Sequence, residues 1–222
     1  MKNIYYALLV LILLANNSFS QQKVSPLVSS YDEYKLLKDK SSYNVSWVSL
    51  GPVLNSARVE SVQVDETKPG TMYVAFGSGN LWKTTDNGIS WKPIFNDIPS
   101  IGIGDIAIAP SNKDIIYVGT GESLKKGRNF TMPGTGIYKS IDGGASWSII
   151  TNGETSGGRI DQIDISKSNS NIILFSDNSS LYKTDDGGLS WLDISSLLPN
   201  KSITGIAIHP TDPNRIWLSF SG

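Results

Sequence analysis

The sequence predicts an all-β fold made of repeated four-stranded antiparallel sheets, and three observations support this prediction. Short runs rich in β-branched and aromatic residues alternate between apolar and polar positions, which is the pattern of half-buried strands. Four of these runs are followed by similar turns and then by a second, denser apolar run. An octapeptide that contains an acid, a glycine and a tryptophan also occurs three times, each time after a pair of such runs.

The paired runs set the period of the repeat. They cover Arg58 to Phe76, Ile103 to Thr120, Arg159 to Ser176, and Ile203 to Phe220. No window between residues 47 and 222 carries a helical stripe of useful length. Each repeat is therefore predicted as strand, turn, strand, loop, strand, tight turn and strand. Its length of about 44 residues is the size of one blade of a β-propeller.

The octapeptide falls where the third and fourth strands of each repeat form a hairpin. Its copies are "TTDNGISW" (84–91), "SIDGGASW" (140–147) and "TDDGGLSW" (184–191). A glycine can adopt the positive φ that a tight hairpin needs, and an aspartate can accept hydrogen bonds from backbone N–H groups of the turn. A tryptophan at the start of the outer strand can cover the turn with its ring. The residues expected in these structural roles are Asp86, Gly88, Trp91, Asp142, Gly144, Trp147, Asp186, Gly188 and Trp191.

The pattern S/T-x-D-x-G-x-S/T-W is matched three times without a mismatch and resembles the Asp box of BNR repeats. The resemblance is to sialidase-like and sortilin-like propellers of secreted bacterial proteins, and it covers residues 47 to 222. It implies four-stranded blades with the boxes at the blade periphery, away from the central funnel. The boxes are therefore expected to be structural. Adjacent Asp185 and Asp186 should point to opposite faces of a strand, so we expect no metal site there.

Composition excludes several classes of function. The 19 basic and 20 acidic side chains nearly cancel, so no basic field is present to attract nucleic acid. The chain has no cysteine, which excludes disulfides, thiol catalysis and thiolate metal sites. Its one histidine, His209, lies in a turn-like "HPTDP" segment and is expected to be a solvated loop residue. We expect no metal and no cofactor.

The first twenty residues predict a signal peptide. Lys2 is followed by an apolar run from Ile4 to Ala15, and "NNSFS" then leads to a cleavage site after Ser20. The apolar run is too short to span a bilayer comfortably, and the lack of cysteine excludes a lipid-modified N-terminal cysteine. The mature chain is expected to be secreted or at the cell surface, with no membrane span.

The mature chain divides into an arm or linker, residues 21–46, and the propeller, residues 47–222. The arm contains "SSYDEYKLLKDK", a candidate short helix with Ser30 and Glu33 as a capping box. Ser46 and Trp47 resemble the outer-strand starts, and we expect them to complete the last blade. The propeller then holds three complete blades and the first two strands of a fourth. This suggests the N-terminal part of a longer propeller, and the alternative is a four-bladed ring that lacks one strand.

Propellers usually bind ligands at the funnel mouth, close to the inner strands. The repeats begin there with Arg58 and Glu60, with Asp105, and with Arg159 and Asp161. The loop after the second strand carries Ser78, Glu122 and Asp177 in the three blades. Glu122 and Asp177 are the candidate catalytic carboxylates, because glycoside hydrolysis needs two acids. Arg58 and Arg159 are candidate binding residues.

Blade 2 has an insertion from Glu122 to Thr135 that offers further binding residues. Its basic and aromatic side chains include Lys125, Arg128 and Phe130, which can hold a glycan or an anionic polymer. The alternative is that this segment is a variable surface loop without a binding function.

The leading functional hypothesis is a secreted binding or scaffold propeller for extracellular polysaccharide or protein. The alternative is a glycoside hydrolase, xyloglucanase-like or sialidase-like, with part of its active site beyond residue 222. Two departures from the sequence patterns of these enzyme families argue against the enzyme hypothesis. The chain has no Arg-Ile-Pro motif of the sialidase kind, and the first-blade loop "FGSGN" has no aspartate where the xyloglucanase family places one. A third hypothesis is a stalk or adhesion element of a surface protein.

Overall fold

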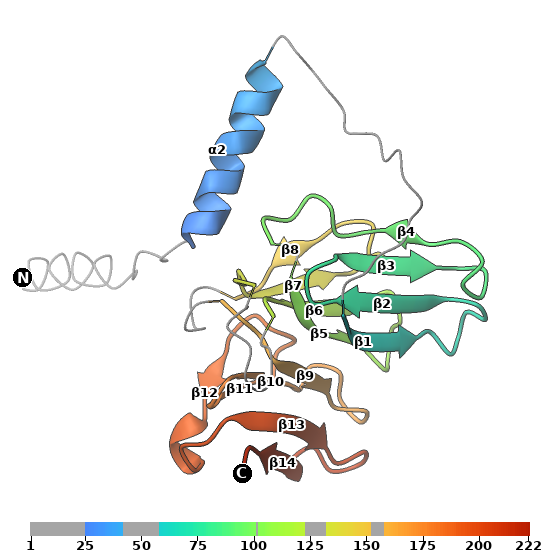
Figure 1. Ribbon diagram of the computed structural model, residues 1–222. Coiled ribbons are helices and arrows are strands. Elements are labelled where there is room, and N and C mark those ends of the chain that lie inside the picture. The colour runs from blue at the N-terminus through green and yellow to red at the C-terminus, as the bar shows by residue number, and fades with distance from the viewer. Residues whose placement is uncertain (1–24, 42–57, 101, 123–131, 152–157) are drawn as a thin grey trace, which may run out of the picture.

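The computed structural model describes residues 25–41, 58–100, 102–122, 132–151 and 158–222 (Figure 1). These residues form three four-stranded antiparallel sheets, a two-stranded sheet and one long helix. Each sheet keeps its strands in chain order, as in a stack of meanders. The predicted β-propeller architecture, with three complete blades and a partial fourth, is confirmed.

The sheets follow one another along the chain. Blade 1 contains β1 (Val59–Val64), β2 (Met72–Phe76), β3 (Leu81–Thr84) and β4 (Lys92–Pro93). Blade 2 contains β5 (Ile103–Ile108), β6 (Ile116–Thr120), β7 (Ile137–Ser140) and β8 (Ser148–Ile149). Blade 3 contains β9 (Gln162–Ile165), β10 (Ile173–Asp177), β11 (Ser180–Thr184) and β12 (Leu192–Asp193), and is followed by a 3-10 turn, η1 (Ser195–Leu197). Half-blade 4 contains β13 (Ile203–Ile208) and β14 (Ile216–Phe220).

The register between first and second strands is the same in every blade. The last residue of the first strand pairs with the first residue of the second. The pairs are Val64–Met72, Ile108–Ile116, Ile165–Ile173 and Ile208–Ile216. This register corrects one sequence interpretation. Asp177 is the last residue of β10 and matches Thr120, whereas the position of Glu122 is occupied in blade 3 by Ser179.

The hydrophobic core lies between consecutive blades. Residues at alternate positions of β5, such as Ile106, are buried against blade 1, where Tyr73 and Phe95 lie in the same cluster. Phe95 meets the rings of Tyr138 and Trp147 edge-on, with centroids 5.5 and 5.1 Å apart. Equivalent clusters join blade 2 to blade 3 and blade 3 to half-blade 4. β6 and β10 are buried along their whole length on both faces, which is why their sequences are dense apolar runs rather than alternating ones.

Polar side chains link the first strands of neighbouring blades. Gln63 Nε2 donates to the carbonyl oxygen of Ile106, 3.2 Å away, which ties β1 to β5. Asp105 Oδ2 accepts the N–H of Ile163 at 2.9 Å, and Asp164 Oδ2 accepts that of Ile208 at 2.7 Å. These contacts join β5 to β9 and β9 to β13. Asp105 therefore has a structural role, although its position had suggested the funnel.

The helix α2 (Pro26–Lys40) lies in the expected arm and is drawn apart from the blades in Figure 1. It begins at Pro26, whose fixed φ suits the first helical position, and Ser30 lies inside it. The predicted capping box of Ser30 and Glu33 is therefore wrong. Within the described ranges, no helix combines the length and the apolar character needed to cross a membrane. The predicted signal peptide (1–20) and the strand expected at Trp47 lie outside the described residues.

Candidate functional site

The octapeptides form tight turns in which an aspartate collects hydrogen bonds. In blade 2, Asp142 Oδ1 accepts the N–H groups of Ala145 and Ser146 at 3.0 and 2.9 Å, and Oδ2 accepts the Ser146 hydroxyl at 2.5 Å. The Ser140 hydroxyl donates to Oδ1 at 2.7 Å. Asp186 and Asp86 make corresponding contacts in blades 3 and 1. The predicted acceptor role of all three aspartates is confirmed.

Glycine and tryptophan also take their predicted places. Gly88, Gly144 and Gly188 have φ of 85°, 92° and 94°. A Cβ placed on any of them would lie 3.4 to 3.5 Å from the ring of the tryptophan three residues later, so the ring covers the turn. At Gly144 the same Cβ would lie only 2.6 Å from Ile94 Cδ1 of the preceding blade. The turn therefore needs glycine both for its φ and for close packing between blades.

The octapeptides also join neighbouring blades. The indole N–H of Trp147 donates to the carbonyl oxygen of Ile94 in blade 1 at 2.9 Å, and that of Trp191 donates to Ile150 in blade 2 at 3.2 Å. A lysine of the preceding blade reaches the same turn. Lys83 Nζ donates to the carbonyl oxygen of Gly143 at 2.8 Å and lies 5.3 Å from the ring centroid of Tyr73.

Lys139 repeats this arrangement in the next junction. Its Nζ donates to the carbonyl oxygen of Gly187 at 3.0 Å and lies 5.3 Å from the Tyr117 ring. The sequence alone predicted no role for these lysines. The signal was nevertheless present, because "LWKT", "IYKS" and "LYKT" place a lysine at the same point of three repeats.

The lowered pKa values of the octapeptide aspartates agree with a structural role in the turn. Hydrogen bonds from Ser90 and Thr84 lower the pKa of Asp86 to about 2, and those from Ser146 lower the pKa of Asp142 still further. A carboxylate held ionised in this way is a poor general acid near neutral pH. The adjacent acids of blade 3 have different partners, because Asp185 pairs with Lys183 at 2.8 Å and Asp186 accepts the N–H of Ser190. Both follow the end of β11, so the expectation that they lie on opposite faces of a strand is wrong.

The opposite ends of the first strands gather the other candidate residues. Arg58, just before β1, forms ion pairs with Glu60 through Nε and with Glu122 of blade 2 through Nη2. Glu122 is only 4% exposed, and its backbone pairs with Met132 across the base of the blade 2 insertion. A Cβ on Gly77 would lie 2.6 Å from the carboxyl carbon of Glu122. The predicted sites at Arg58 and Glu122 are therefore one cluster that bridges blades 1 and 2.

Blade 3 repeats part of this cluster. Arg159 Nε lies 3.3 Å from Asp161 Oδ1, and Asp161 Oδ2 accepts the N–H of Asn178 at 2.7 Å. Asp161 and Asp177 are both buried, and Asp177 ends the strand that precedes Asn178. Arg58 with Glu60 and Arg159 with Asp161 thus hold equivalent positions in alternate blades, where blade 2 has Gly102 and Gly104. The candidates Lys125, Arg128 and Phe130 lie outside the described residues.

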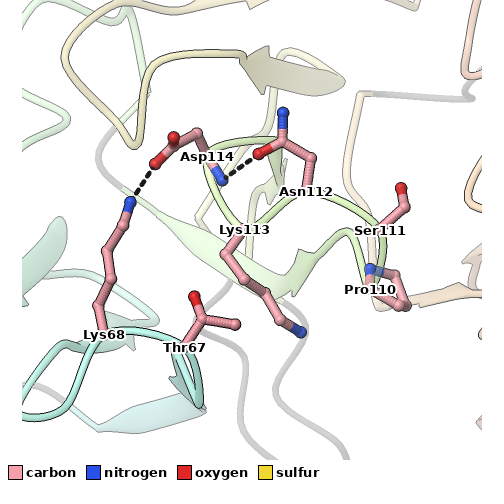
Figure 2. A pocket seen from close by; sticks show the side chains of 7 residues that line it. All are labelled: Thr67, Lys68, Pro110, Ser111, Asn112, Lys113 and Asp114. Atoms are coloured by element: carbon pink, nitrogen blue, oxygen red, sulfur yellow. Dashed lines mark hydrogen bonds and ion pairs between the residues drawn. The ribbon is translucent and has the colours of Figure 1, made fainter.

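A small pocket lies at the other end of the strands, between the first turns of blades 1 and 2. Figure 2 shows its lining, in which Lys68 meets Asp114 at 2.5 Å and Asn112 Oδ1 accepts the N–H of Asp114 at 3.0 Å. Its volume is about 220 Å³, and two of its three charged lining residues, Lys68 and Asp114, are paired with each other. This arrangement favours a structural contact between turns over a ligand site.

The strand order and the contacts between blades define the chain as a β-propeller chain. Comparisons with known proteins show which propeller proteins it is similar to. No family model matches the sequence. The chain is similar to a xyloglucanase of Hypocrea jecorina (strain QM6a), with 24% identity over 181 residues that cover 74% of this chain and 18% of the relative. It is also similar to xyloglucanase Xgh74A of Acetivibrio thermocellus, with 25% identity over 183 residues, 74% of this chain and 19% of the relative. The matched part thus spans about a fifth of these relatives.

Solved structures show the same architecture. An ancestral GH74 enzyme aligns with a TM-score of 0.58 at 21% identity, covering 75% of this chain and 22% of that chain. The GH74 enzyme of Niastella koreensis aligns with a TM-score of 0.54 at 21% identity, covering 71% and 24%. YCF48 from Cyanidioschyzon merolae aligns with a TM-score of 0.50 at 17% identity, covering 71% and 49%. At these identities the structural likeness establishes the propeller fold.

Proposed function

We propose that this chain forms part of a polysaccharide-directed propeller of the glycoside hydrolase kind. The observation that carries the proposal is the sequence similarity to xyloglucanases, which extends over about three quarters of the chain. This favours the hydrolase alternative over the scaffold hypothesis that sequence analysis had placed first. The proposal includes residues 1–20 as an export signal, because a protein must leave the cell to reach extracellular polysaccharide.

The octapeptides fit this proposal as Asp boxes of BNR repeats. The carboxylates of these octapeptides accept hydrogen bonds from their own turns, and the indole N–H groups of blades 2 and 3 donate to the preceding blade. Their aspartates are therefore fasteners, and recognition of the ligand belongs to the other end of the first strands.

The glycan-facing surface proposed here is the cluster of Arg58, Glu60 and Glu122, together with Arg159 and Asp161. Carboxylates and guanidinium groups recognise sugar hydroxyls through charge-assisted hydrogen bonds. Arg58 keeps 43% of its side chain exposed while it contacts two carboxylates, so it can meet a ligand without moving. Glu122 and Asp177 remain the candidate catalytic acids of this surface, as glycoside hydrolysis requires a pair.

Binding is tested by isothermal titration of the chain with xyloglucan oligosaccharides. Arg58→Ala and Arg159→Ala should each weaken binding about tenfold, the equivalent of one charge-assisted hydrogen bond. Lys68→Ala is the matched control, because it removes a paired cation at the far end of the same strand. Equal losses for all three variants, or no binding by the unaltered chain, would contradict the proposed surface.

Catalysis is tested separately by the release of reducing sugar. If the chain supplies an essential acid, Glu122→Gln or Asp177→Asn abolishes turnover while binding persists. The second candidate function, a glycan-binding module without turnover, is favoured by the ion pair between Glu122 and Arg58, which already occupies that carboxylate. Binding without turnover in the unaltered chain supports the second candidate.

A further inference from the structure

Among the residues that the structure describes, the residues other than glycine that have a positive φ are all asparagines. They are Asn80, Asn87 and Asn178, with φ of 77°, 58° and 55°. Asparagine tolerates this conformation better than most residues. Hydrogen bonds hold the side-chain amides of two of them. Asn80 Oδ1 accepts the N–H of Leu81 at 2.6 Å, and Asn178 Oδ1 accepts the Ser202 hydroxyl at 2.8 Å.

The third asparagine differs in the residue that follows it. Asn87 precedes Gly88, whereas the residues after Asn80 and Asn178 carry side chains. The backbone nitrogen of the next residue can attack the amide carbon of an asparagine and close a cyclic imide. A side chain on that next residue hinders the attack, and glycine has none. Asn87 is therefore the most reactive of the three. The chain's other Asn–Gly pair, residues 152–153, lies outside the described residues.

Contacts within blade 1 explain why its octapeptide holds an asparagine where those of blades 2 and 3 hold a glycine. The N–H of Asn87 donates to the carbonyl oxygen of Gly70 at 3.1 Å, as that of Gly143 donates to Asp114 at 2.9 Å in blade 2. A Cβ on Gly143 would lie 3.3 Å from Asp114 Oδ1. In blade 1 a Cβ on Gly70 would lie 3.5 Å from Asn87 Cγ. Each turn thus has room for one side chain at this contact, and in blade 1 that side chain is the asparagine.

The folded turn restrains the nitrogen that would attack. The N–H of Gly88 donates to Thr84 Oγ1 at 2.9 Å, and the preceding N–H is held by Gly70. Blade 2 has the same restraint, because Ser140 Oγ accepts the N–H of Gly144 at 2.9 Å. The Gly88 nitrogen can therefore approach the amide carbon only when the turn opens and the bond to Thr84 breaks.

We propose that Asn87 is a site of spontaneous deamidation, and that the Thr84 hydroxyl controls its rate. The Gly88 nitrogen loses its proton and forms a bond with Asn87 Cγ, while the Asn87 Nδ2 group takes up a proton and leaves as ammonia. Water then opens the cyclic imide. If the new bond to Cγ breaks, the product is aspartate. If the bond to the main-chain carbonyl carbon breaks, the product is isoaspartate, with the main chain running through the former side chain.

Either product loosens the octapeptide of blade 1. Isoaspartate lengthens the main chain between the N–H groups that Gly70 and Thr84 hold, so both hydrogen bonds cannot keep their geometry. Aspartate adds a negative charge beside Asp86, whose carboxylate already accepts the N–H and hydroxyl of Ser90. The octapeptides of blades 2 and 3 have glycine at this position and are immune to this change. Blade 1 is therefore the blade whose octapeptide loosens with age.

The rate is tested by incubating the folded 222-residue chain at mildly alkaline pH and mapping its peptides by mass spectrometry. Asn87 should convert faster than Asn80 and Asn178. Thr84→Val removes the hydroxyl and should raise the rate at Asn87 at least about fivefold, the equivalent of one lost hydrogen bond. Thr84→Ser keeps a hydroxyl, as in blade 2, and should keep the slow rate. Thr184→Val is the matched control, because it removes the equivalent hydroxyl of blade 3.

A measurement without any substitution keeps the proposal falsifiable if Thr84→Val fails to fold. The unaltered chain should convert Asn87 more slowly when folded than when unfolded in urea, and equal rates would show that the turn does not restrain the Gly88 nitrogen. Conversion of Asn87 no faster than that of Asn80 and Asn178 would overturn the site. Equal rates in folded Thr84→Val and Thr84→Ser would overturn the control by the hydroxyl.

The consequence for the fold is tested with Asn87→Gly, which gives blade 1 the glycine of blades 2 and 3. After the same incubation, the unfolding midpoint of the unaltered chain should fall further than that of Asn87→Gly, and hydrogen exchange should become faster in blade 1. Equal falls in the two chains would contradict a loosened turn. None of these readouts involves a glycan, so they stand apart from the proposed function.

Discussion

The octapeptide of blade 1 and those of blades 2 and 3 have nearly the same sequence but make different contacts. In blade 1, the indole N–H of Trp91 donates to the carbonyl oxygen of Gly88 in its own turn, 3.1 Å away. In blade 2, the indole of Trp147 reaches across to Ile94 of the preceding blade. In both turns the aspartate accepts the backbone N–H and the hydroxyl of the serine four residues later, and Asp142 also accepts the N–H of Ala145. Among the described residues, the indole of blade 1 therefore donates within its own turn, whereas those of blades 2 and 3 link their turns to the preceding blade.

The lysines of the third strands also differ between blades in the partners that they contact. Lys83 and Lys139 each reach the turn of the following blade, whereas Lys183 pairs with Asp185 of its own blade. At each inner junction, two of the polar contacts therefore involve the octapeptide and cross the junction in opposite directions. One is an indole that reaches back and the other is an ammonium group that reaches forward.

Replacing the octapeptide glycine by alanine should have the largest effect on the free energy of unfolding, and it should separate the glycine's role in the turn from its role in packing between blades. Gly88→Ala should cost about 1–2 kcal/mol, because a side chain at this positive φ is strained. Gly144→Ala should cost about 1 kcal/mol more, because its Cβ also displaces Ile94 Cδ1. Urea denaturation measures both values.

Ile94→Val provides the control for the glycine comparison, because it removes Cδ1, the atom that the new Cβ would approach to 2.6 Å. In a double-mutant cycle, Ile94→Val should recover the additional cost of Gly144→Ala and leave Gly88→Ala unchanged. Equal costs for the two glycine variants would show that blade packing does not depend on Gly144.

Removal of the indole N–H tests the link itself. Trp147→Phe should cost about 2 kcal/mol, from smaller packing area and from a lost hydrogen bond to Ile94. Trp91→Phe loses a bond within one turn and should cost about 1 kcal/mol. Hydrogen exchange should show the difference, with faster exchange in both blades 1 and 2 for Trp147→Phe. Faster exchange in blade 1 alone would argue against a link between blades.

The lysine comparison should give a smaller effect. Lys139→Met keeps the apolar stem, loses the contacts with Gly187 and Tyr117, and should cost about 1 kcal/mol. Lys183→Met loses a pair with the exposed Asp185 and should change stability by less than about 0.5 kcal/mol. Thermal unfolding of both variants provides the measurement, and a larger cost at Lys183 would reverse the assignment.

The repeat made most of the fold predictable. Strand order, blade number and the contacts of Asp142, Gly144 and Trp147 within the turn follow from local chemistry, and local chemistry is what a sequence displays. Contacts between blades were harder to predict from the sequence. Lys83 and Asp105 act on residues about 60 positions further along the chain. Nothing near them in the sequence identifies those partners.

The candidate site shows the same division. The equivalence of Arg58 and Arg159 could be predicted because both open a repeat of the same type. The pairing of Arg58 with Glu122 could not, because Glu122 belongs to the next blade. Asp177 was misaligned with Glu122 because turn residues gave no anchor for the register, which the strand pairs later fixed.

The octapeptide aspartates should also determine how stability falls in acid, and the expected change in the unfolding midpoint is small. Hydrogen bonds hold the pKa of Asp86 at about 2 and those of Asp142 and Asp186 lower still. Since an unfolded aspartate titrates near pH 4, their ionised forms favour folding above about pH 4, and this stabilisation is lost as pH falls through the folded pKa.

Burial acts in the opposite direction at Asp164, where it raises the pKa, so Asp164 does not contribute to this acid loss. The unfolding midpoint should therefore fall between about pH 4 and pH 2, and Asp142→Asn should make that fall shallower while lowering the midpoint at pH 7. Asp86→Asn should change the slope less, because Asp142 accepts one more backbone N–H, that of Ala145, and keeps the lower pKa. An unchanged slope in Asp142→Asn would mean that other carboxylates control acid unfolding.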